Sequence, residues 1–164
     1  MAKLKESDFY YGAVLSMLLN NKICPALVES GKDRQVYEFT TDQGDFKLFL
    51  KYRSAPTTKN EDIYRSWQFN FTESDLKELH QYIEEEKHLS VGLVCGESEL
   101  GKSLYAVLHK EELCSLLEAG KTSLTISFKK SEKSKKSKKR KKCFRIPVGG
   151  GRDNDMQIPA DRKF

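Results

Sequence analysis

The sequence predicts an α/β fold, with α+β as the alternative, in which a mixed central β-sheet is flanked by helices. A β-hairpin is indicated at 36–53, where two strand-like segments flank the turn residues Asp42-Gln43-Gly44. Its second segment, 45–53, carries apolar residues on both faces, which is typical of a strand inside a sheet. Elsewhere, segments with helical spacing alternate with apolar runs of strand length. We therefore expect the hairpin to form the centre of the core.

The chain of 164 residues has the length of a single domain, 1–164. We expect a core at 1–128, a flexible basic loop at 129–142, and a return strand and tail at 143–164. The hydrophobic share of 38% and charged share of 32% indicate a soluble protein. No apolar run approaches the roughly 20 residues of a membrane span, and the start of the chain lacks a signal-peptide core. We expect a cytoplasmic protein without a membrane partner.

The first helix is predicted to start at an N-cap, Ser7, and to end at Asn20-Asn21. Its buried face at helical spacing comprises Tyr10, Ala13, Val14, Met17 and Leu18. The segment 23–29 follows, and Pro25 near its start favours an edge strand.

The segment 54–62 reads as a polar, exposed loop, and 66–71 then alternates with the period of a strand. Trp67, Phe69 and Phe71 lie on one face of that strand. We predict that they belong to the core; the alternative is that such an aromatic face stacks on single-stranded bases.

Thr72 is the expected N-cap of a second helix, and Asp75 stands where a capping box would have Glu or Gln. The remaining elements alternate between strands and one short helix. They are a buried strand at 89–95, a strand at 103–108, a helix at 110–120, a strand at 122–128 and its return partner at 143–147. The last two form a C-terminal β-hairpin with the basic loop as its connection. We expect the tail to be held only if Ile158 and Phe164 dock on the body.

Signatures of cofactor chemistry are absent from the sequence. The four cysteines, at 24, 95, 114 and 143, form no C-x-x-C pair, and we predict buried, reduced thiols. The chain has neither a phosphate-binding loop of the Walker type nor a Gly-x-Ser-x-Gly elbow. We predict no cofactor.

Three segments carry a family resemblance that covers roughly 7–117. The hairpin end Leu48-Phe49-Leu50-Lys51-Tyr52-Arg53, the run 91–95 and the strand-into-helix step 105–113 resemble the core of restriction-endonuclease-like domains of the PD-(D/E)XK, Mrr-type superfamily. The resemblance implies a helix before a hairpin. It also implies an acid on the first strand, and on the second an acid or glutamine two residues before a lysine. On this chain it places Glu38 at the acid and Lys51 at the lysine.

The chain departs from the family pattern at Phe49, two residues before Lys51. Phosphodiester hydrolysis of this kind uses Mg²⁺ held by oxygen ligands, and phenylalanine offers none. The motif Asp45-x-Lys47 is an alternative register, with Glu29 or Asp33 as an assisting acid. The competing interpretation is that Asp45 and Lys47 are exposed hairpin residues.

The charge of the chain is concentrated in the basic tract 129–142, which contains ten Lys or Arg and one Glu and so carries +9. Because the whole chain carries +5, the rest carries −4. Such a run binds phosphate backbones without sequence preference. The candidate nucleic-acid-binding residues are Lys129, Lys130, Lys133, Lys135, Lys136, Lys138, Lys139, Arg140, Lys141 and Lys142. The alternatives are a contact to an acidic protein, a contact to anionic lipid beside an anchor, and a solubilising loop.

The leading prediction is a nucleic-acid-binding protein on a restriction-endonuclease-like core that has lost its catalytic acid. The second hypothesis is a small protein-interaction module, of the accessory or immunity type, whose acidic body or exposed Tyr10 and Tyr11 contact a partner. The third is an active Mg²⁺-dependent nuclease that uses Asp45 and Lys47 with Glu29. Enzymatic activity is thus expected only under the third hypothesis.

Overall fold

The computed structural model describes residues 1–31, 34–60, 63–130, 142–149 and 154–164. Within them the chain forms three α-helices, which are α1 (Glu6–Asn20), α2 (Glu73–Glu85) and α3 (Lys110–Glu118). No helix in this part of the chain has the length and apolar character that a membrane span requires. Together with the sheets, these helices confirm the predicted mixed α/β class.

The first sheet, sheet A, has the strand order β1-β2-β3-β6-β7. Its strands are β1 (Ala26–Ser30), β2 (Gln35–Thr41), β3 (Gly44–Arg53), β6 (His88–Cys95) and β7 (Leu104–His109). Neighbours run antiparallel except β3 and β6, which are parallel. The predicted hairpin is confirmed, because β2 pairs with β3 from the turn at Thr41↔Gly44 onward. The edge position expected for the segment after Pro25 is also confirmed by β1.

The second sheet, sheet B, is antiparallel and has the order β10-β9-β8-β5-β4. Its strands are β4 (Thr58–Asn60), β5 (Tyr64–Asn70), β8 (Ser123–Lys129), β9 (Cys143–Pro147) and β10 (Asp155–Pro159). The sequence did not predict a second sheet. The loop prediction for 54–62 is wrong at β4, whose three polar residues are short of the length that reveals a strand by periodicity. β9 lies beside β8, the place expected of the return strand.

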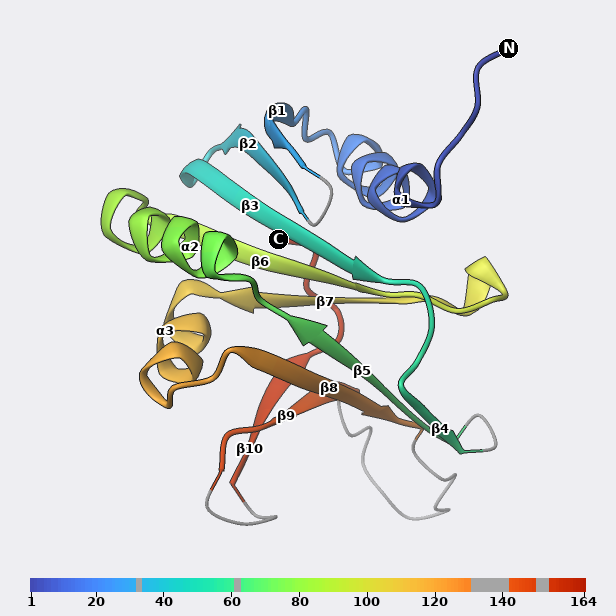
Figure 1. Cartoon of the computed structure of the whole chain (residues 1–164). Coiled ribbons are helices and arrows are strands. Elements are labelled where there is room, and N and C mark those ends of the chain that lie inside the picture. The colour runs from blue at the N-terminus through green and yellow to red at the C-terminus, as the bar shows by residue number, and fades with distance from the viewer. Residues whose placement is uncertain (32–33, 61–62, 131–141, 150–153) are drawn as a thin grey trace.

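The two faces of sheet A are covered by different elements, as Figure 1 shows. On one face Tyr52 of β3 stacks on Tyr10 of α1, with ring centroids 5.1 Å apart. The next residue back along the strand, Lys51, points to the opposite face and contacts α2. Sheet B and α3 share that second face, because one apolar cluster joins both sheets to α2 and α3.

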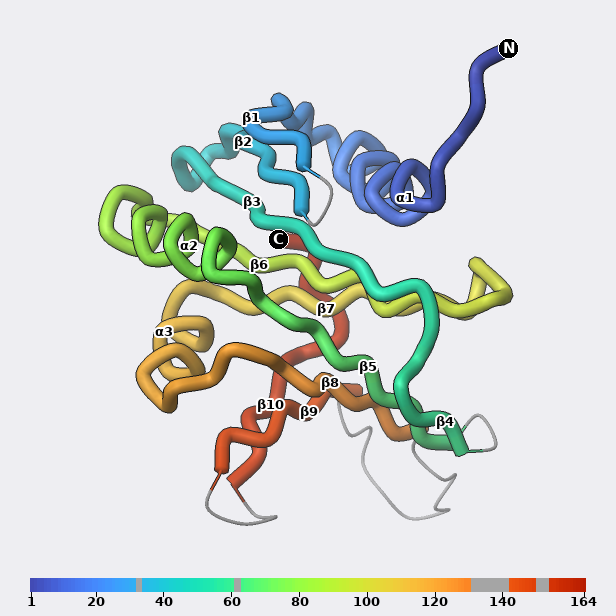
Figure 2. Tube along the Cα trace, in the orientation of Figure 1, coloured from blue at the N-terminus to red at the C-terminus, as the bar shows by residue number. Residues whose placement is uncertain are grey.

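The chain passes between the sheets several times, which Figure 2 traces along the Cα path. After β3 it leaves sheet A, forms β4 and β5 in sheet B, and returns through α2 to β6. This long connection allows β6 to lie parallel to β3, since parallel neighbours cannot be joined by a tight turn. A second passage runs from β7 through α3 to β8.

The core confirms the expectation for β3, because Phe49 and Leu50 point to opposite faces and both are fully buried. Trp67 and Phe69 of β5 are buried in the cluster between the sheets, as predicted, and are not free to stack on bases. The indole of Trp67 also donates a hydrogen bond to the Gly96 carbonyl, at 2.9 Å. This bond ties sheet B to the end of β6.

Helix α1 differs from its prediction in two respects. It begins at Glu6 with Lys5 as its N-cap, two residues before the predicted N-cap Ser7. Its buried residues are Tyr10, Tyr11, Val14 and Leu18, whereas Ala13 is exposed. The buried face of α1 is rotated from the predicted one because two tyrosines pack on Tyr52. Tyr10 stacks on its ring, and Tyr11 packs edge-on against it with the centroids 5.2 Å apart. The hypothesis of an exposed tyrosine pair is therefore wrong.

The C-terminal residues pack on the rest of the protein through Ile158 and Phe164, the two contacts on which the expected ordering of the tail depended. Ile158 is fully buried in β10. The ring of Phe164 packs edge-on against Phe39 and Phe46 of the hairpin, at 5.3 and 5.5 Å between centroids. Of the four thiols predicted to be buried, Cys95 is buried, Cys114 and Cys143 are partly buried, and Cys24 is exposed, so the prediction is wrong for Cys24.

Two glycine-to-alanine substitutions are expected to act in opposite directions. A Cβ at Gly96 would lie 2.5 Å from the Arg53 carbonyl oxygen and 2.7 Å from the Tyr10 ring, so we expect a loss of about 1–3 kcal/mol of unfolding free energy. Gly12 is in the interior of α1 with nothing within 4 Å, so alanine there should add about 0.5–1 kcal/mol. Urea denaturation of both variants measures this. Equal effects at the two positions would contradict the packing described for Gly96.

Candidate functional site

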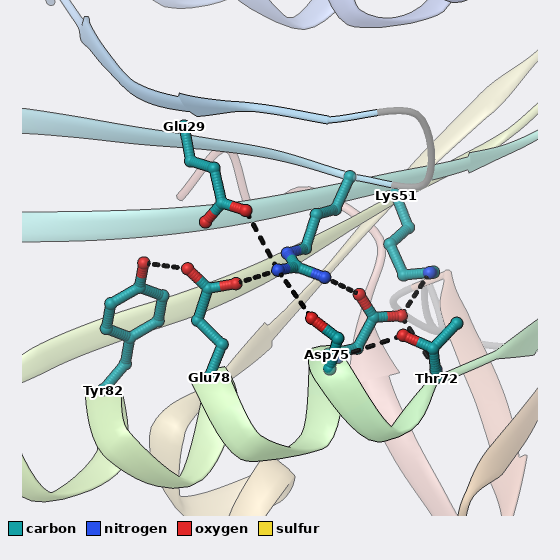
Figure 3. Close-up of polar contacts among 8 residues, drawn as sticks. Glu29, Lys51, Thr72, Asp75, Glu78 and Tyr82 are labelled. Carbon is teal, nitrogen blue, oxygen red and sulfur yellow. Dashed lines mark hydrogen bonds and ion pairs between the residues drawn. The ribbon is translucent and has the colours of Figure 1, made fainter.

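Lys51, the residue at the lysine position of the resemblance, is held in a buried ion pair. Its ammonium lies 2.6 Å from Oδ2 of Asp75 in α2, and the side chains of the two residues are 8% and 0% exposed. Figure 3 shows this pair between β3 and the start of α2. The ammonium group of Lys51 is therefore paired with the carboxylate of Asp75 inside the protein.

Asp75 forms three further polar contacts, two through its carboxylate and one through its backbone N–H. Arg34 binds Oδ1 at 2.7 Å, and the backbone N–H of Thr72 donates to Oδ2 at 3.0 Å. The N–H of Asp75 in turn donates to the Thr72 hydroxyl at 3.1 Å, so aspartate completes the capping box. Burial opposes ionisation of Asp75, but the hydrogen bonds from Lys51, Thr72 and Arg34 outweigh it and hold its pKa below the usual range.

Arg34 extends this network to β1 and to the next turn of α2. Its guanidinium lies 2.9 Å from Glu29 and 2.5 Å from Glu78. A hydrogen bond with Glu78, aided by burial, raises the pKa of Glu29. Burial opposes ionisation of Glu78, but hydrogen bonds with Glu29 and Tyr82 lower its pKa. Glu29 is thus the carboxyl that holds a proton most readily, which limits the repulsion between the two. In Figure 3 the carboxylates of Glu29 and Glu78 both point toward this guanidinium.

Lys47 belongs to a separate ion cluster. Its ammonium lies 3.2 Å from Glu38 and 2.9 Å from Glu86, and 4.2 Å from the centre of the Tyr82 ring. Burial would lower the pKa of Lys47, but hydrogen bonds to Glu86 and Glu38 outweigh it and raise the pKa. The interpretation of Lys47 as an exposed hairpin residue is wrong, because the end of α2 covers it. Asp45 is exposed, and it accepts a hydrogen bond from the Thr40 hydroxyl at 2.7 Å.

The candidate catalytic residues do not form one site. Glu38 pairs with Lys47, Lys51 pairs with Asp75, and Glu29 pairs with Arg34. Phe49 is fully buried in the core between them. Within the described residues, no group of three or more His, Cys, Asp or Glu side chains is placed to hold a metal ion. The residues of the hairpin do not fit Mg²⁺, which prefers several oxygen ligands in octahedral geometry.

A second buried carboxylate, Glu97, follows the C-terminal end of β6 and joins the two sheets. Arg65 of β5 lies 2.9 Å from it and Lys59 of β4 lies 3.4 Å away. The N–H of Glu97 donates to the Ser103 hydroxyl at 3.0 Å. Its side chain is 4% exposed, so this cluster also fixes the relative position of the two sheets.

An open cleft of about 440 Å³ lies beside Lys51, between the end of β3 and β5. It is lined by Glu6, Lys51, Tyr52, Arg53, Ser54, Ala55, Pro56, Gln68, Phe69 and Asn70. Most of these groups are polar, and Arg53 and Asn70 are exposed. The cleft is a candidate binding site that the sequence did not indicate, because its walls come from segments far apart in the chain.

The basic tract is described only at its ends. Lys129, Lys130 and Lys142 are exposed, whereas the other seven candidate cations and the predicted flexible loop lie outside the described residues. The pairing of Phe128 with Phe144 brings both ends of the tract to the same end of sheet B. The Lys130 N–H donates to the Ile63 carbonyl at 2.7 Å, and the Lys142 carbonyl accepts from Ala160 at 3.1 Å.

Comparison with known proteins gives no assignment, since no protein-family model, curated protein or solved structure matches this chain. Sequence reasoning missed Asp75, Arg34 and Glu97 as charged groups of the interior. A signal existed for Asp75, whose Thr-x-x-Asp spacing meets a capping box. Arg34 and Glu97 carried none, because each follows or precedes a strand and reads as a turn residue.

Replacement of Asp75 by asparagine should be strongly destabilising, because it leaves Lys51 and Arg34 without their shared counter-charge. We expect a loss of about 3–5 kcal/mol at pH 7 by chemical denaturation. Since the folded-state pKa of Asp75 is lowered, its contribution is present above the ordinary carboxyl pKa of about 3.9. This contribution is lost as the pH falls through the folded-state pKa of Asp75. The difference in unfolding free energy between the wild type and Asp75→Asn should therefore become smaller in acid.

The matched control is Glu99→Gln, which removes an acid from an exposed pair with Lys102. That change should stay within about 0.5 kcal/mol. A loss of similar size in both variants would show that Asp75 is not the anchor of a buried network.

Proposed function

We propose that this chain is a nucleic-acid-binding protein that contacts phosphate backbones through the basic tract 129–142 and does not hydrolyse them. The observation that carries the proposal is the charge distribution. Ten cations and one acid stand in fourteen consecutive residues, whereas the remainder of the chain is net negative. Both ends of the tract start from one end of sheet B, at exposed positions. A cationic segment offered from a folded body is suited to a polyanion.

The core supports a binding role over a catalytic one. α1 precedes the hairpin β2–β3, the order that the restriction-endonuclease-like resemblance implies, and we propose a degenerate core of that type. Phe49 stands where that family would have a metal ligand. Lys51 is neutralised by Asp75 and Glu38 by Lys47, so neither offers a free group for metal-assisted hydrolysis.

Recognition through the tract would have little sequence preference. Lysine binds phosphate as a point charge, and the affinity comes largely from release of counterions. If about six cations meet phosphates, the slope of log K against log salt concentration on duplex DNA is about −5. The partner class is therefore nucleic acid in general, with DNA and RNA to be compared directly.

Neutralising four charges of the tract tests this proposal. We expect the variant Lys138→Gln, Lys139→Gln, Arg140→Gln, Lys141→Gln to bind labelled random duplex more weakly, because it loses up to four phosphate contacts. The slope of log K against log salt should become shallower by up to about 4. Fluorescence anisotropy at several salt concentrations measures both quantities, with duplex DNA, single-stranded DNA and RNA as probes.

The control removes the same charge from exposed lysines elsewhere, at 22, 77, 87 and 102. Its affinity and slope should stay close to those of the wild type. Equal losses in both variants would make the interaction a general effect of net charge. Absence of binding at low salt would contradict the proposal, and Mg²⁺-dependent cleavage in the same samples would contradict the non-catalytic core.

A further inference from the structure

One edge of β5 is bare along half of the strand. β8 pairs with β5 over its whole length, but on the other side β4 covers only Tyr64 to Ser66. Thr57 extends this cover by one residue, since its N–H donates to the Ser66 carbonyl at 2.7 Å and its hydroxyl accepts from the Gln68 N–H at 3.1 Å. Pro56 comes before it and has no N–H to offer a ladder. Among the described strands, none pairs with Gln68–Asn70 on this side.

The backbone groups that face this edge follow from the alternation of hydrogen bonds along a strand. The Phe71 N–H donates to the Thr122 carbonyl on the β8 side, at 3.0 Å, whereas the Gln68 N–H points to the Thr57 side. Successive residues direct their N–H and C=O groups to opposite sides. The Gln68 carbonyl and the Asn70 N–H therefore face the open side, where an added strand can pair with them.

This bare edge forms one wall of the cleft beside Lys51. The opposite wall is the end of β3 and the link to β4, from Lys51 to Pro56, and the volume is about 440 Å³. That volume lies in the range of about 300–1,000 Å³ that is typical of ligand sites. Three residues of edge extend about 10 Å, so an extended occupant would pair over about three residues.

The lining of the cleft has no net charge, since Glu6 offsets Arg53 and Asp75 offsets Lys51, so the preference for an acidic group rests on Arg53 itself. Arg53 is exposed, and its guanidinium forms no ion pair or hydrogen bond with any described residue. The Lys51 ammonium is balanced by Asp75, so it adds no net charge. Glu6 lies on the α1 side of the cleft. Arg53 is thus a cation without a bonded partner next to the bare edge, and the Gln68 carbonyl and the Asn70 N–H are the backbone groups of that edge that can bind an added strand.

We propose that this cleft binds an extended peptide segment with an acidic side chain, which adds a strand to the edge of β5 and places its carboxylate on Arg53. Main-chain hydrogen bonds supply affinity in this mode, and the carboxylate supplies selectivity. The proposal goes beyond nucleic-acid binding and does not depend on it, since the tract and the cleft share no residue.

The experiment selects peptides from a phage-displayed pool of random sequences against the full chain. We expect enriched peptides to carry Asp or Glu between residues that favour strands. Synthetic copies of them should bind Arg53→Glu at least about tenfold more weakly, because a charge-assisted hydrogen bond is lost. Asn70→Pro, which removes the free N–H, should also weaken binding. The control Arg145→Glu alters an exposed arginine of β9, which lies in sheet B with β5. This change should leave the affinity for the peptide within about twofold of the wild type.

Backbone amide shifts give a second readout that does not rely on any variant. Addition of an enriched peptide should move the ¹⁵N–¹H signals of Asn70 and its neighbours in β5. The proposal is overturned if the pool yields no enriched peptide, or if the peptides bind Arg53→Glu as tightly as the wild type. It is also overturned if binding is lost only in the variant neutralised at 138–141, since the peptides then bind the tract.

Discussion

The buried carboxylate of Asp75 is the contact on which the arrangement of this protein depends. It binds a cation from the middle of sheet A, Lys51, and another from the start of β2, Arg34, and it caps α2. A carboxylate that is fully buried is costly unless it is paired, so these three elements are held in one geometry. In that geometry α2 packs on sheet A and connects β5 of sheet B to β6 of sheet A. Glu97, which follows the C-terminal end of β6, plays the same part with Arg65 of sheet B.

This constraint also determines what the hairpin can do. A lysine beside a bound metal and an acid supports phosphodiester hydrolysis, but Lys51 is bound to a structural acid, and Phe49 stands two residues before it in place of a metal ligand. The polar atoms of the hairpin stabilise the contact between sheet and helix. The two surfaces for which we propose binding, the tract 129–142 and the cleft where β5 lacks a partner, do not include these ion pairs except for Lys51 at the edge of the cleft.

Much of sheet A could be predicted from local pattern. The turn at 42–44, the two-sided burial of β3 and the apolar run of β6 are each signals contained in a short stretch of the chain, and each led to the right element. Sheet B could not be predicted as a sheet, because its strands come from three separate parts of the chain and two of them are short or follow glycines. The candidate site was the weakest part. Glu38 and Lys51 looked like partners in sequence, but each found another partner in α2 or on the neighbouring strand, and pairing across such distances leaves no periodic trace.

Asp75 acts in this protein as a structural counter-ion to Lys51 and Arg34 and not as a metal ligand. Titration of its side-chain carboxyl carbon by ¹³C NMR, with and without millimolar Mg²⁺, tests this most directly. We expect a pKa below the ordinary value for aspartate and a ¹³C signal that Mg²⁺ does not move. An ordinary pKa, or a shift of that carbon on addition of Mg²⁺, would contradict it.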